Sequence, residues 1–220
     1  MIQVQHFVFN DFLENTYLLW DETGDCLIID PGCNTPEERQ AVLQFIEGNK
    51  LKVVLLLNTH CHIDHVLGNK WVKETFGVAF WTHKKEVVVL DTLVNVGKMY
   101  GVFVEASPPP DRFLEEGDEV TFGNSKLSVL FTPGHSPGSI SFYAEAEQFV
   151  IGGDVLFQSS IGRTDLPGGS YRLLMENIMN KFMVLPDEVV VYSGHGPATT
   201  IGLEKRNNPF ILEYMAESEK

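Results

Sequence analysis

The pattern of hydrophobic and polar positions predicts a chain that opens with β-strands and then alternates strands with helices. Residues 2–9, 16–20 and 26–29 are short apolar runs separated by polar turns, which is typical of an antiparallel opening. A helix should follow from Thr35 to about Glu47. There a capping side chain, a proline and two glutamates stand in the order that begins a helix.

The same pattern predicts the remaining elements. Residues 51–57 are almost entirely apolar, as expected of a strand covered on both faces. Residues 101–111 contain three consecutive prolines and should be irregular. We expect helices at residues 66–76, 83–100, 170–182 and 209–215, and strands at residues 78–82, 119–122, 127–131, 139–143, 149–151 and 189–192, the last being the final strand.

Composition narrows the class of protein. The length of 220 residues and the apolar fraction of 44% predict one globular domain over residues 1–220. The net charge of −14 argues against a nucleic-acid partner, because phosphate binding needs clustered Lys and Arg. No apolar run approaches the roughly 20 residues that span a bilayer, so no membrane partner is expected. The chain has three cysteines without a C-x-x-C pair and no signal-peptide pattern, so we expect a cytoplasmic protein. The sequence does not indicate the oligomeric state.

Residues 59–65, Thr-His-Cys-His-Ile-Asp-His, place four metal-competent side chains directly after the apolar run. In extended backbone His60 and His62 point to the same side and can share one ion, whereas Cys61 points away and should be a small buried residue. Asp64 and His65 come next and could hold a second ion. The alternative is an N-cap followed by ordinary loop histidines, but this density of ligands favours a metal site.

Three further candidates stand just past the ends of predicted strands. His135, Asp154 and His195 each lie in a turn rich in glycine or proline. Each alone could be a turn residue, but strand ends on one edge of a sheet bring such side chains together. His6 and His83 have no such companions and are interpreted as structural. The candidate ligands are therefore His60, His62, Asp64, His65, His135, Asp154 and His195.

With these residues in order, the sequence resembles the metallo-β-lactamase superfamily, and within it the glyoxalase II-like hydroxyacylglutathione hydrolases. The motif at residues 60–65, followed by His135, Asp154 and His195, is similar to the ligand order of the superfamily. Residues 162–169 and 194–202 look like the glyoxalase II branch. The resemblance covers nearly the whole chain. It implies an α+β fold, an αββα sandwich of two mixed β-sheets flanked by helices, with the metal site at one edge.

The resemblance also implies which ligands bind which metal ion. One ion would be bound by His60, His62 and His135, and the other by Asp64, His65 and His195, with Asp154 bridging both. Asp64 and Asp154 would be the catalytic carboxylates around a metal-bridged hydroxide that acts as the nucleophile. Nitrogen-rich ligands fit two Zn²⁺ ions best, whereas the two carboxylates also suit Fe or Mn.

The implied substrate is a small-molecule acyl thioester, such as an S-acylglutathione. A thiolate can depart without being protonated, and the sequence offers no clear general acid outside the ligands. Asp30 and Arg163 are expected to orient ligands, although a turn aspartate and a surface ion pair are equally good interpretations. Ser136, Ser139 and Tyr171 are candidates for substrate contact. Full-length glyoxalase II carries a helical C-terminal extension that binds glutathione, and this chain is expected to lack the full extension.

Three other functions remain open at this point. A mononuclear iron persulfide dioxygenase also has a Gly-Arg-Thr-Asp motif and would use His60, His135 and Asp154, but the continuation Leu166-Pro167 disfavours it. A nuclease of the same superfamily is disfavoured by the acidity of the chain. A metal-binding module without catalysis is disfavoured by the complete set of ligands.

Overall fold

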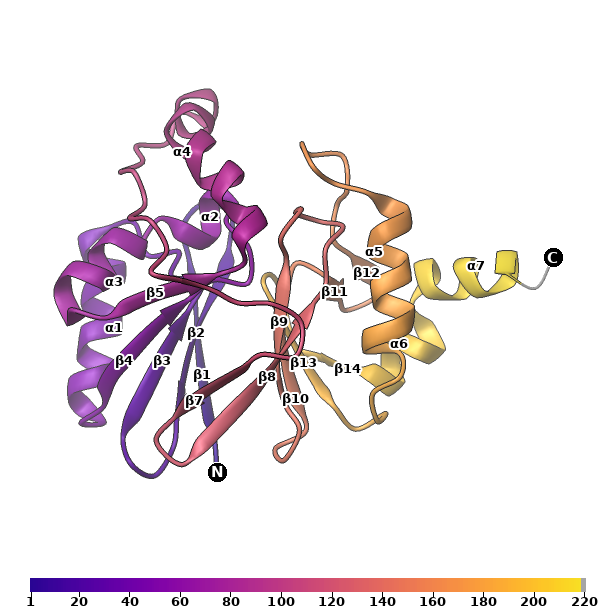
Figure 1. Ribbon diagram of the computed structural model, residues 1–220, viewed down its shortest axis with the longest axis horizontal. Helices are drawn as coiled ribbons and strands as arrows, with labels where there is room; N and C mark the ends of the chain where they lie inside the picture. The colour runs from indigo at the N-terminus through magenta and orange to yellow at the C-terminus, as the bar shows by residue number, and fades with distance from the viewer. Residues whose placement is uncertain (219–220) are drawn as a thin grey trace.

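The computed structural model describes residues 1–218. Two six-stranded mixed β-sheets form the middle layers of the fold (Figure 1). The first sheet contains β1 (Gln3–Phe9), β2 (Glu14–Trp20), β3 (Asp25–Ile29), β4 (Lys52–Leu57), β5 (Ala79–Thr82) and β6 (Arg112–Phe113), in that order. The second sheet contains β14 (Thr199–Thr200), β13 (Val190–Ser193), β10 (Phe149–Gly153), β9 (Ile140–Ala144), β8 (Ser125–Phe131) and β7 (Glu119–Phe122), in that order. A separate hairpin pairs β11 (Leu156–Phe157) with β12 (Ser160–Ile161).

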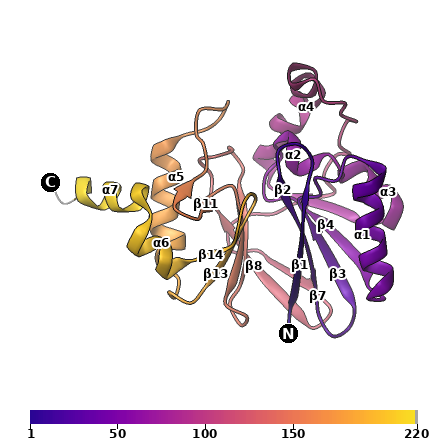
Figure 2. The same ribbon diagram turned by 180° about the vertical axis from the view of Figure 1, so that it is seen from behind.

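Helices cover the outer faces of both sheets, as the two opposite views show (Figures 1 and 2). The first sheet carries α1 (Pro36–Gly48), α2 (Ile63–Val66), α3 (Asn69–Phe76) and α4 (Val87–Tyr100), the last entered through a 3-10 turn, Lys84–Glu86. The second sheet carries α5 (Tyr171–Asn177), which continues as a π-helical turn, Ile178–Phe182, and α6 (Ile201–Asn207). The last helix, α7 (Pro209–Ser218), extends outward from α6 toward the C-terminus. This arrangement is the αββα sandwich that the resemblance implied.

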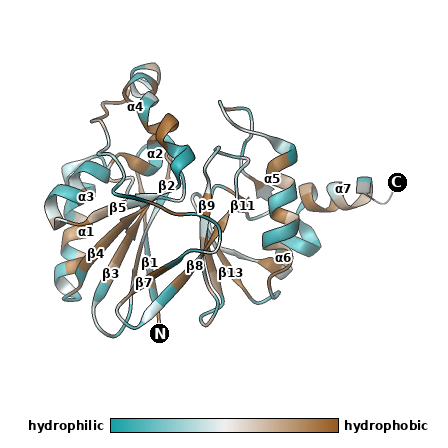
Figure 3. Ribbon diagram, viewed as in Figure 1, coloured by the Kyte–Doolittle hydropathy of each residue, from teal (hydrophilic) through white to brown (hydrophobic). Residues whose placement is uncertain are grey.

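Buried hydrophobic residues form three layers, a central one between the two sheets and one between each sheet and its helices. Figure 3 shows hydrophobic residues along the strands of both sheets. Leu55 and Leu57 of β4 face that central layer, whereas Leu56, between them, faces the helices of the first sheet. Burying each such leucine contributes roughly 1.5–3 kcal/mol relative to leaving it exposed. The prediction that residues 51–57 form a strand buried on both faces is therefore confirmed.

The start of α1 shows how local sequence signals and tertiary contacts coincide. The Thr35 hydroxyl accepts a hydrogen bond from the Glu38 N–H, and the Glu38 carboxylate accepts one from the Thr35 N–H, which completes a capping box. The same carboxylate also accepts the backbone N–H of Asn10, at 2.6 Å. The cap thereby ties the turn between β1 and β2 to the helix that follows β3.

The helix expected over residues 66–76 is in fact two short helices, α2 and α3, with a break at Leu67-Gly68. The N–H of Gly68 donates to the carbonyl oxygen of Pro31 at 2.7 Å. A Cβ on Gly68 would lie 2.6 Å from Cys33 Sγ, so only glycine permits this approach. Because of this break, the turn after β3 packs closely against the segment that carries residues 60–65.

Residues 189–192 are not the last strand, because β14 and α6 follow β13. β14 has only two residues, too few for an alternation of hydrophobic and polar side chains to be recognised. The strands β6, β11 and β12 also have two residues each and were not predicted for the same reason. The helix α6 begins where the Thr200 hydroxyl accepts the Leu203 N–H. Within residues 1–218, every helix is too short or too polar to cross a lipid bilayer.

Candidate metal centre

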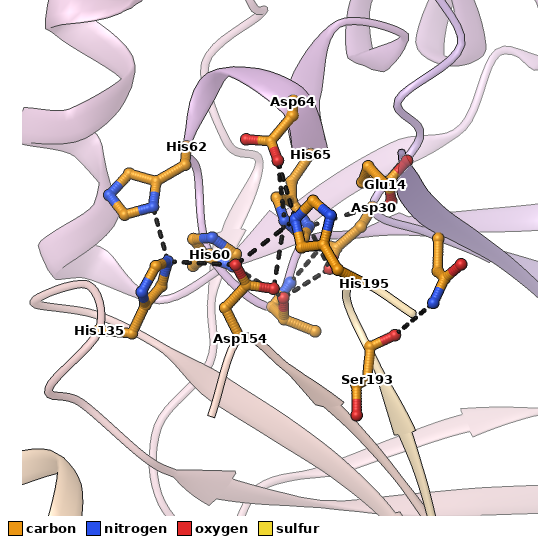
Figure 4. Close-up of polar contacts among 12 residues, drawn as sticks. Glu14, Asp30, His60, His62, Asp64, His65, His135, Asp154, Ser193 and His195 are labelled. Carbon is orange, nitrogen blue, oxygen red and sulfur yellow. Dashed lines mark hydrogen bonds and ion pairs between the residues drawn. The ribbon is translucent and has the colours of Figure 1, made fainter. Parts of the chain in front are cut away.

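The carboxyl ends of four strands meet at one edge of the sandwich. β8, β10 and β13 of the second sheet run in the same direction, and β4 of the first sheet ends beside them. The loops after these strands carry seven side chains that point toward a common space (Figure 4). We call them the centre: His60, His62, Asp64, His65, His135, Asp154 and His195.

Three histidines make the first group of the centre: His60, His62 and His135. Each offers a ring nitrogen, and these nitrogens lie within 4.8 Å of one another. His62 Nδ1 lies 2.8 Å from His135 Nε2. His60 and His62 come from the loop after β4, whereas His135 comes from the loop after β8. The first group therefore joins the two sheets.

The second group consists of Asp64, His65 and His195. Asp64 Oδ2 lies 3.0 Å from His195 Nε2 and 3.5 Å from His65 Nε2. Asp64 and His65 belong to α2, and His195 follows β13, so this group also draws on both sheets. His65 is fully buried, whereas the His195 side chain is 27% exposed.

Asp154 lies between the two groups. Its Oδ1 lies 3.5 Å from His65 Nε2, and its Oδ2 lies 3.4 Å from His135 Nε2 and 3.6 Å from His195 Nε2. The preceding Gly153 has a φ of +54°, which glycine adopts without strain, and this turn brings the carboxylate over the edge of the sheet. One carboxylate thus faces histidines from both groups.

Hydrogen bonds on the far side of the rings orient His60 and His65. The Nδ1–H of His60 donates to Thr59 Oγ1 at 3.1 Å, and the Nδ1–H of His65 donates to Asp30 Oδ2 at 3.1 Å. In a neutral ring the Nε2 atom then offers a lone pair toward the centre. Asp30 also accepts the Thr59 N–H at 2.7 Å and the Thr59 hydroxyl at 2.5 Å. Its position matches the orienting role expected for it.

His135 and His195 are oriented in the same way, by backbone carbonyl groups. The Nδ1–H of His135 donates to the carbonyl oxygen of Arg163 at 2.7 Å. The Nδ1–H of His195 donates to the carbonyl oxygens of Phe12 and Leu13, at 3.1 and 3.2 Å. In both rings Nε2 is left to face the centre.

Burial and charge set the protonation of the centre. Burial lowers the pKa of His60 well below its usual value and lowers the pKa of His62 to about 3, so both rings are neutral and able to bind a metal. Burial opposes the charged form of His65, but Asp64 and Asp154 outweigh it and raise its pKa. For Asp64 burial is likewise outweighed, chiefly by His65, and its pKa falls below the usual range.

Three buried atoms of the centre have no hydrogen-bond partner among the described residues: His60 Nε2, His65 Nε2 and Asp154 Oδ1. An unsatisfied buried polar atom costs about 1–3 kcal/mol. When His60 and His65 are neutral, as metal binding requires, and Nδ1 of each ring donates elsewhere, all three atoms offer lone pairs. A cation that accepts lone pairs, such as a divalent metal ion, fits this set of atoms.

Two expectations about neighbouring residues need correction. The Arg163 side chain is more than half exposed and pairs with Asp165, at 2.7 Å, so it is its backbone oxygen and not its guanidinium that orients His135. Ser136 and Ser139 are buried. The Ser136 hydroxyl donates to Glu86 and the Ser139 hydroxyl donates to the Ser136 carbonyl oxygen, so both side chains are engaged inside the protein and not exposed to a substrate. Tyr171 is 45% exposed and remains a candidate for substrate contact.

Sequence reasoning missed two buried carboxylates beside the centre. Glu14 lies with Oε1 4.0 Å from His65 Nδ1, and burial raises its pKa well above the usual value. Glu86 accepts hydrogen bonds from the loops on both sides of the first group. No motif marks either residue: Glu14 begins a strand and Glu86 lies in a helical run. Only contacts between distant segments identify them.

The open side of the centre is bordered by exposed apolar side chains. Leu13 is 65% exposed, although its backbone carbonyl contacts His195, and its φ of +58° is uncommon for a leucine. Tyr100, at the end of α4, is 52% exposed and packs edge-on against Phe12, with ring centroids 5.6 Å apart. A substrate that reaches the centre from this side meets an apolar border.

Comparisons with known proteins agree with this geometry. Residues 10–195 match the family model described as the metallo-beta-lactamase superfamily. The chain is similar to the hydroxyacylglutathione hydrolase GloC of Haemophilus influenzae, with 38% identity over 91% of this chain and 93% of the relative. It is also similar to the probable metallo-hydrolase YqgX of Bacillus subtilis, with 40% identity over 90% of this chain and 92% of the relative.

Two solved structures have a similar fold. The B3 metallo-beta-lactamase BLEG-1 superposes with a TM-score of 0.87 and 37% identity, covering 95% of this chain and 99% of that one. TTHA1623 in a di-iron-bound form superposes with a TM-score of 0.83 and 35% identity, covering 94% of this chain and 99% of that one.

Proposed function

This chain belongs to the metallo-beta-lactamase superfamily, and from that membership and the geometry of the centre we propose that it is a metal-dependent hydrolase of small-molecule thioesters. The observation that carries the proposal is the meeting of two three-residue groups around one carboxylate, Asp154. Such an arrangement suits two metal ions that act on one substrate.

In this proposal the first group, His60, His62 and His135, holds one divalent ion, and the second group, Asp64, His65 and His195, holds the other. Asp154 serves both, because its two oxygens face histidines of both groups. Zn²⁺ fits five imidazoles and two carboxylates best, and iron is the alternative, since a similar structure is described in a di-iron-bound form.

The chemistry of the centre is hydrolysis by activated water. Bound divalent ions lower the pKa of water to about 7 and polarise the acyl carbonyl group. The carboxylates of Asp64 and Asp154 balance the positive charge and orient the attacking water by accepting its hydrogen bonds. The Nδ1–H bonds behind His60, His65, His135 and His195 hold the rings in place throughout.

The surroundings of the centre favour a leaving group that needs no proton. Asp30, Glu14 and Glu86 are buried carboxylates next to ligands of the centre. Asp165, near His135, is exposed, but its hydrogen bonds from Arg163 lower its pKa to about 2, so it is ionised and cannot act as a general acid. A thiolate departs unprotonated, because the pKa of its thiol is about 8.5 in the cysteine model, whereas an amide nitrogen requires a general acid. This supports a thioester substrate over an amide.

The Haemophilus influenzae relative supports a thioester of glutathione, because its name is hydroxyacylglutathione hydrolase. The match covers 93% of that relative, so a protein of nearly the same length as this chain is described as a hydroxyacylglutathione hydrolase. An S-(2-hydroxyacyl)glutathione is therefore the first substrate to test. Thioesters with apolar acyl groups come next, because Leu13 and Tyr100 border the open side.

Metal quantification on anaerobically purified protein, coupled to a panel of substrates, tests the proposal. The panel holds glutathione thioesters, a β-lactam and glutathione persulfide with an oxygen electrode. We expect about two metal equivalents and turnover of thioesters. His195→Ala should lose one equivalent and at least about tenfold in kcat/KM. His6→Ala is the matched control, since His6 is an exposed residue of β1 outside the centre.

Two results would contradict the proposal. One is a single metal equivalent together with full activity of His195→Ala. The other is oxygen uptake with glutathione persulfide in place of thioester cleavage, which would support the dioxygenase.

A further inference from the structure

Glu86 is a fully buried carboxylate, at the end of the 3-10 turn that precedes α4, and its hydrogen bonds all go to loops of the centre. Its Oε2 accepts the backbone N–H of Cys61 at 2.7 Å. Its Oε1 accepts the Ser136 hydroxyl at 2.7 Å and the backbone N–H of Gly138 at 2.6 Å. Three donors of this kind satisfy an ionised carboxylate that has no exposure to water.

The donors belong to different sheets. Cys61 lies between His60 and His62, in the loop after β4 of the first sheet. Ser136 and Gly138 follow His135 in the loop after β8 of the second sheet. One carboxylate from a third segment therefore holds the two loops that carry all three histidines of the first group.

The contact with the second loop is close enough to restrict the sequence there. A Cβ on Gly138 would lie 2.8 Å from Glu86 Oε1 and 2.9 Å from its Cγ, so a glycine is needed for the carboxylate to reach that loop. A second bond, from the Ile140 N–H to the Thr59 carbonyl oxygen at 2.8 Å, joins the residue before His60 to the start of β9. Glu86 instead joins the residue between His60 and His62 to the residues directly after His135.

We propose that Glu86 is a positioning residue: it sets the spacing between the loop of His60 and His62 and the loop of His135, and thereby the affinity of the first group for its metal ion. This rests on the proposed function, since it takes the first group as a metal site. Glu86 touches neither metal nor substrate and acts through the backbone of Cys61 and Gly138.

Glu86→Gln tests this role with the smallest change in shape. The best orientation of the amide keeps its oxygen toward Ser136 and Gly138 and turns its NH₂ toward the Cys61 N–H, so the link to the His60 and His62 loop is lost. We expect Zn²⁺ to bind the first group about 10–100-fold more weakly, with the second group unchanged. Glu86→Asp, which keeps the charge on a shorter side chain, should recover part of the affinity.

A matched control separates positioning from general stability. Glu204 is another buried carboxylate with three donors, the Ser159 N–H, the Thr199 hydroxyl and the Asn208 side chain, and none of these is next to a residue of the centre. Glu204→Gln should lower Tm to a similar extent and leave Zn²⁺ binding at the level of the unchanged protein.

The measurement is Zn²⁺ retained against a graded series of chelator concentrations, together with the visible spectrum of the Co²⁺-loaded protein. The spectrum of Glu86→Gln should resemble that of His62→Ala, in which the first group is broken, and not that of His195→Ala. If Glu86→Gln fails to fold, Ser136→Ala removes a single hydrogen bond to the same carboxylate and should weaken Zn²⁺ binding a few-fold.

Equal Zn²⁺ retention by Glu86→Gln and Glu204→Gln, with equal losses of Tm, would overturn the proposal; for Ser136→Ala the corresponding result is unchanged retention. Because Zn²⁺ binding is measured without substrate, the two proposals can fail separately. A protein that binds two ions and cleaves no thioester contradicts the proposed function and leaves the test of Glu86 valid.

Discussion

Asp30 shows how much one side chain contributes to the second group of the centre. Its Oδ1 accepts from the Asn58 side chain and the Thr59 N–H, and its Oδ2 accepts from the Thr59 hydroxyl and His65 Nδ1–H. Its φ of +50° belongs to the left-handed region, which aspartate and asparagine tolerate better than most residues. Asp30, which orients His65, thus has a strained backbone and accepts four hydrogen bonds.

Replacing this carboxylate by an amide should weaken metal binding at the proposed second site. In Asp30→Asn either orientation of the amide turns an NH₂ toward two donors, so about 1–3 kcal/mol of stability should be lost. The affinity of the second group for Zn²⁺ should fall about 10–100-fold, because His65 loses its orienting acceptor. Urea unfolding and Zn²⁺ titration measure the two effects.

Asp21 provides the control for that experiment. Its carboxylate also accepts four donors, from Thr23, Asn124 and Ser125, but it joins two hairpins away from the centre. Asp21→Asn should therefore lower stability without changing Zn²⁺ affinity. Similar Zn²⁺ affinity in both variants would show that Asp30 does not orient a ligand.

Among the elements, α5 and the turn after β8 depend on each other. The turn passes so close to the helix that a Cβ on Gly134 would lie 2.3 Å from the backbone nitrogen of Leu174. The Ser170 N–H donates to the Gly134 carbonyl oxygen at 2.7 Å, and the Asn177 side chain donates to the Pro133 carbonyl oxygen at 2.8 Å. The helix of the second sheet therefore determines where His135 lies.

Gly134→Ala should displace this turn. Gly134 has a φ of +141°, so alanine brings backbone strain of about 1 kcal/mol, and the collision with α5 adds about 1–3 kcal/mol. Denaturant unfolding should show the loss, and Zn²⁺ retention by the first group should fall with it. Gly117→Ala is the control, because Gly117 has a φ of +83° and no atom near its Cβ position. A loss in Gly134→Ala no larger than that in Gly117→Ala would exclude a tight turn.

At the scale of the whole molecule, the centre connects the two halves of the sandwich. His60, His62, Asp64 and His65 come from the first half, and His135, Asp154 and His195 come from the second. A metal ion bound by residues of both halves acts as a cross-link that the unfolded chain lacks. Metal binding should therefore contribute to folding stability.

Removal of metal by a chelator should lower Tm, and Zn²⁺ should restore it. A ligand present at 100 times its Kd stabilises the folded state by about 2.7 kcal/mol, so the change should be large enough for differential scanning calorimetry. The double variant His62→Ala with His195→Ala, which breaks both groups, should show a Tm that chelator does not change. Identical Tm values for the unchanged protein with and without chelator would argue against ions that join the halves.

A residue of the site could be predicted from the sequence only when neighbouring residues in the chain mark it. His60, His62, Asp64 and His65 lie within six residues, and His135, Asp154 and His195 each follow a recognisable strand, so spacing alone identified them. Glu86 and Glu14 could not be found in this way, since each acts on residues from distant segments. The burial of Ser136 and Ser139 was not apparent, because no local pattern shows that the distant Glu86 packs against this loop.

Local sequence patterns were enough to predict the order of the longer elements, the both-face burial of β4 and the side chains of the centre, because alternation, caps and ligand spacing are properties of neighbouring residues. The tertiary structure decided which strand ends meet and which nitrogen of each histidine faces the centre. It also decided that a backbone oxygen, not the Arg163 guanidinium, orients His135. These depend on how the two sheets pack, and no short stretch of the chain contains that information.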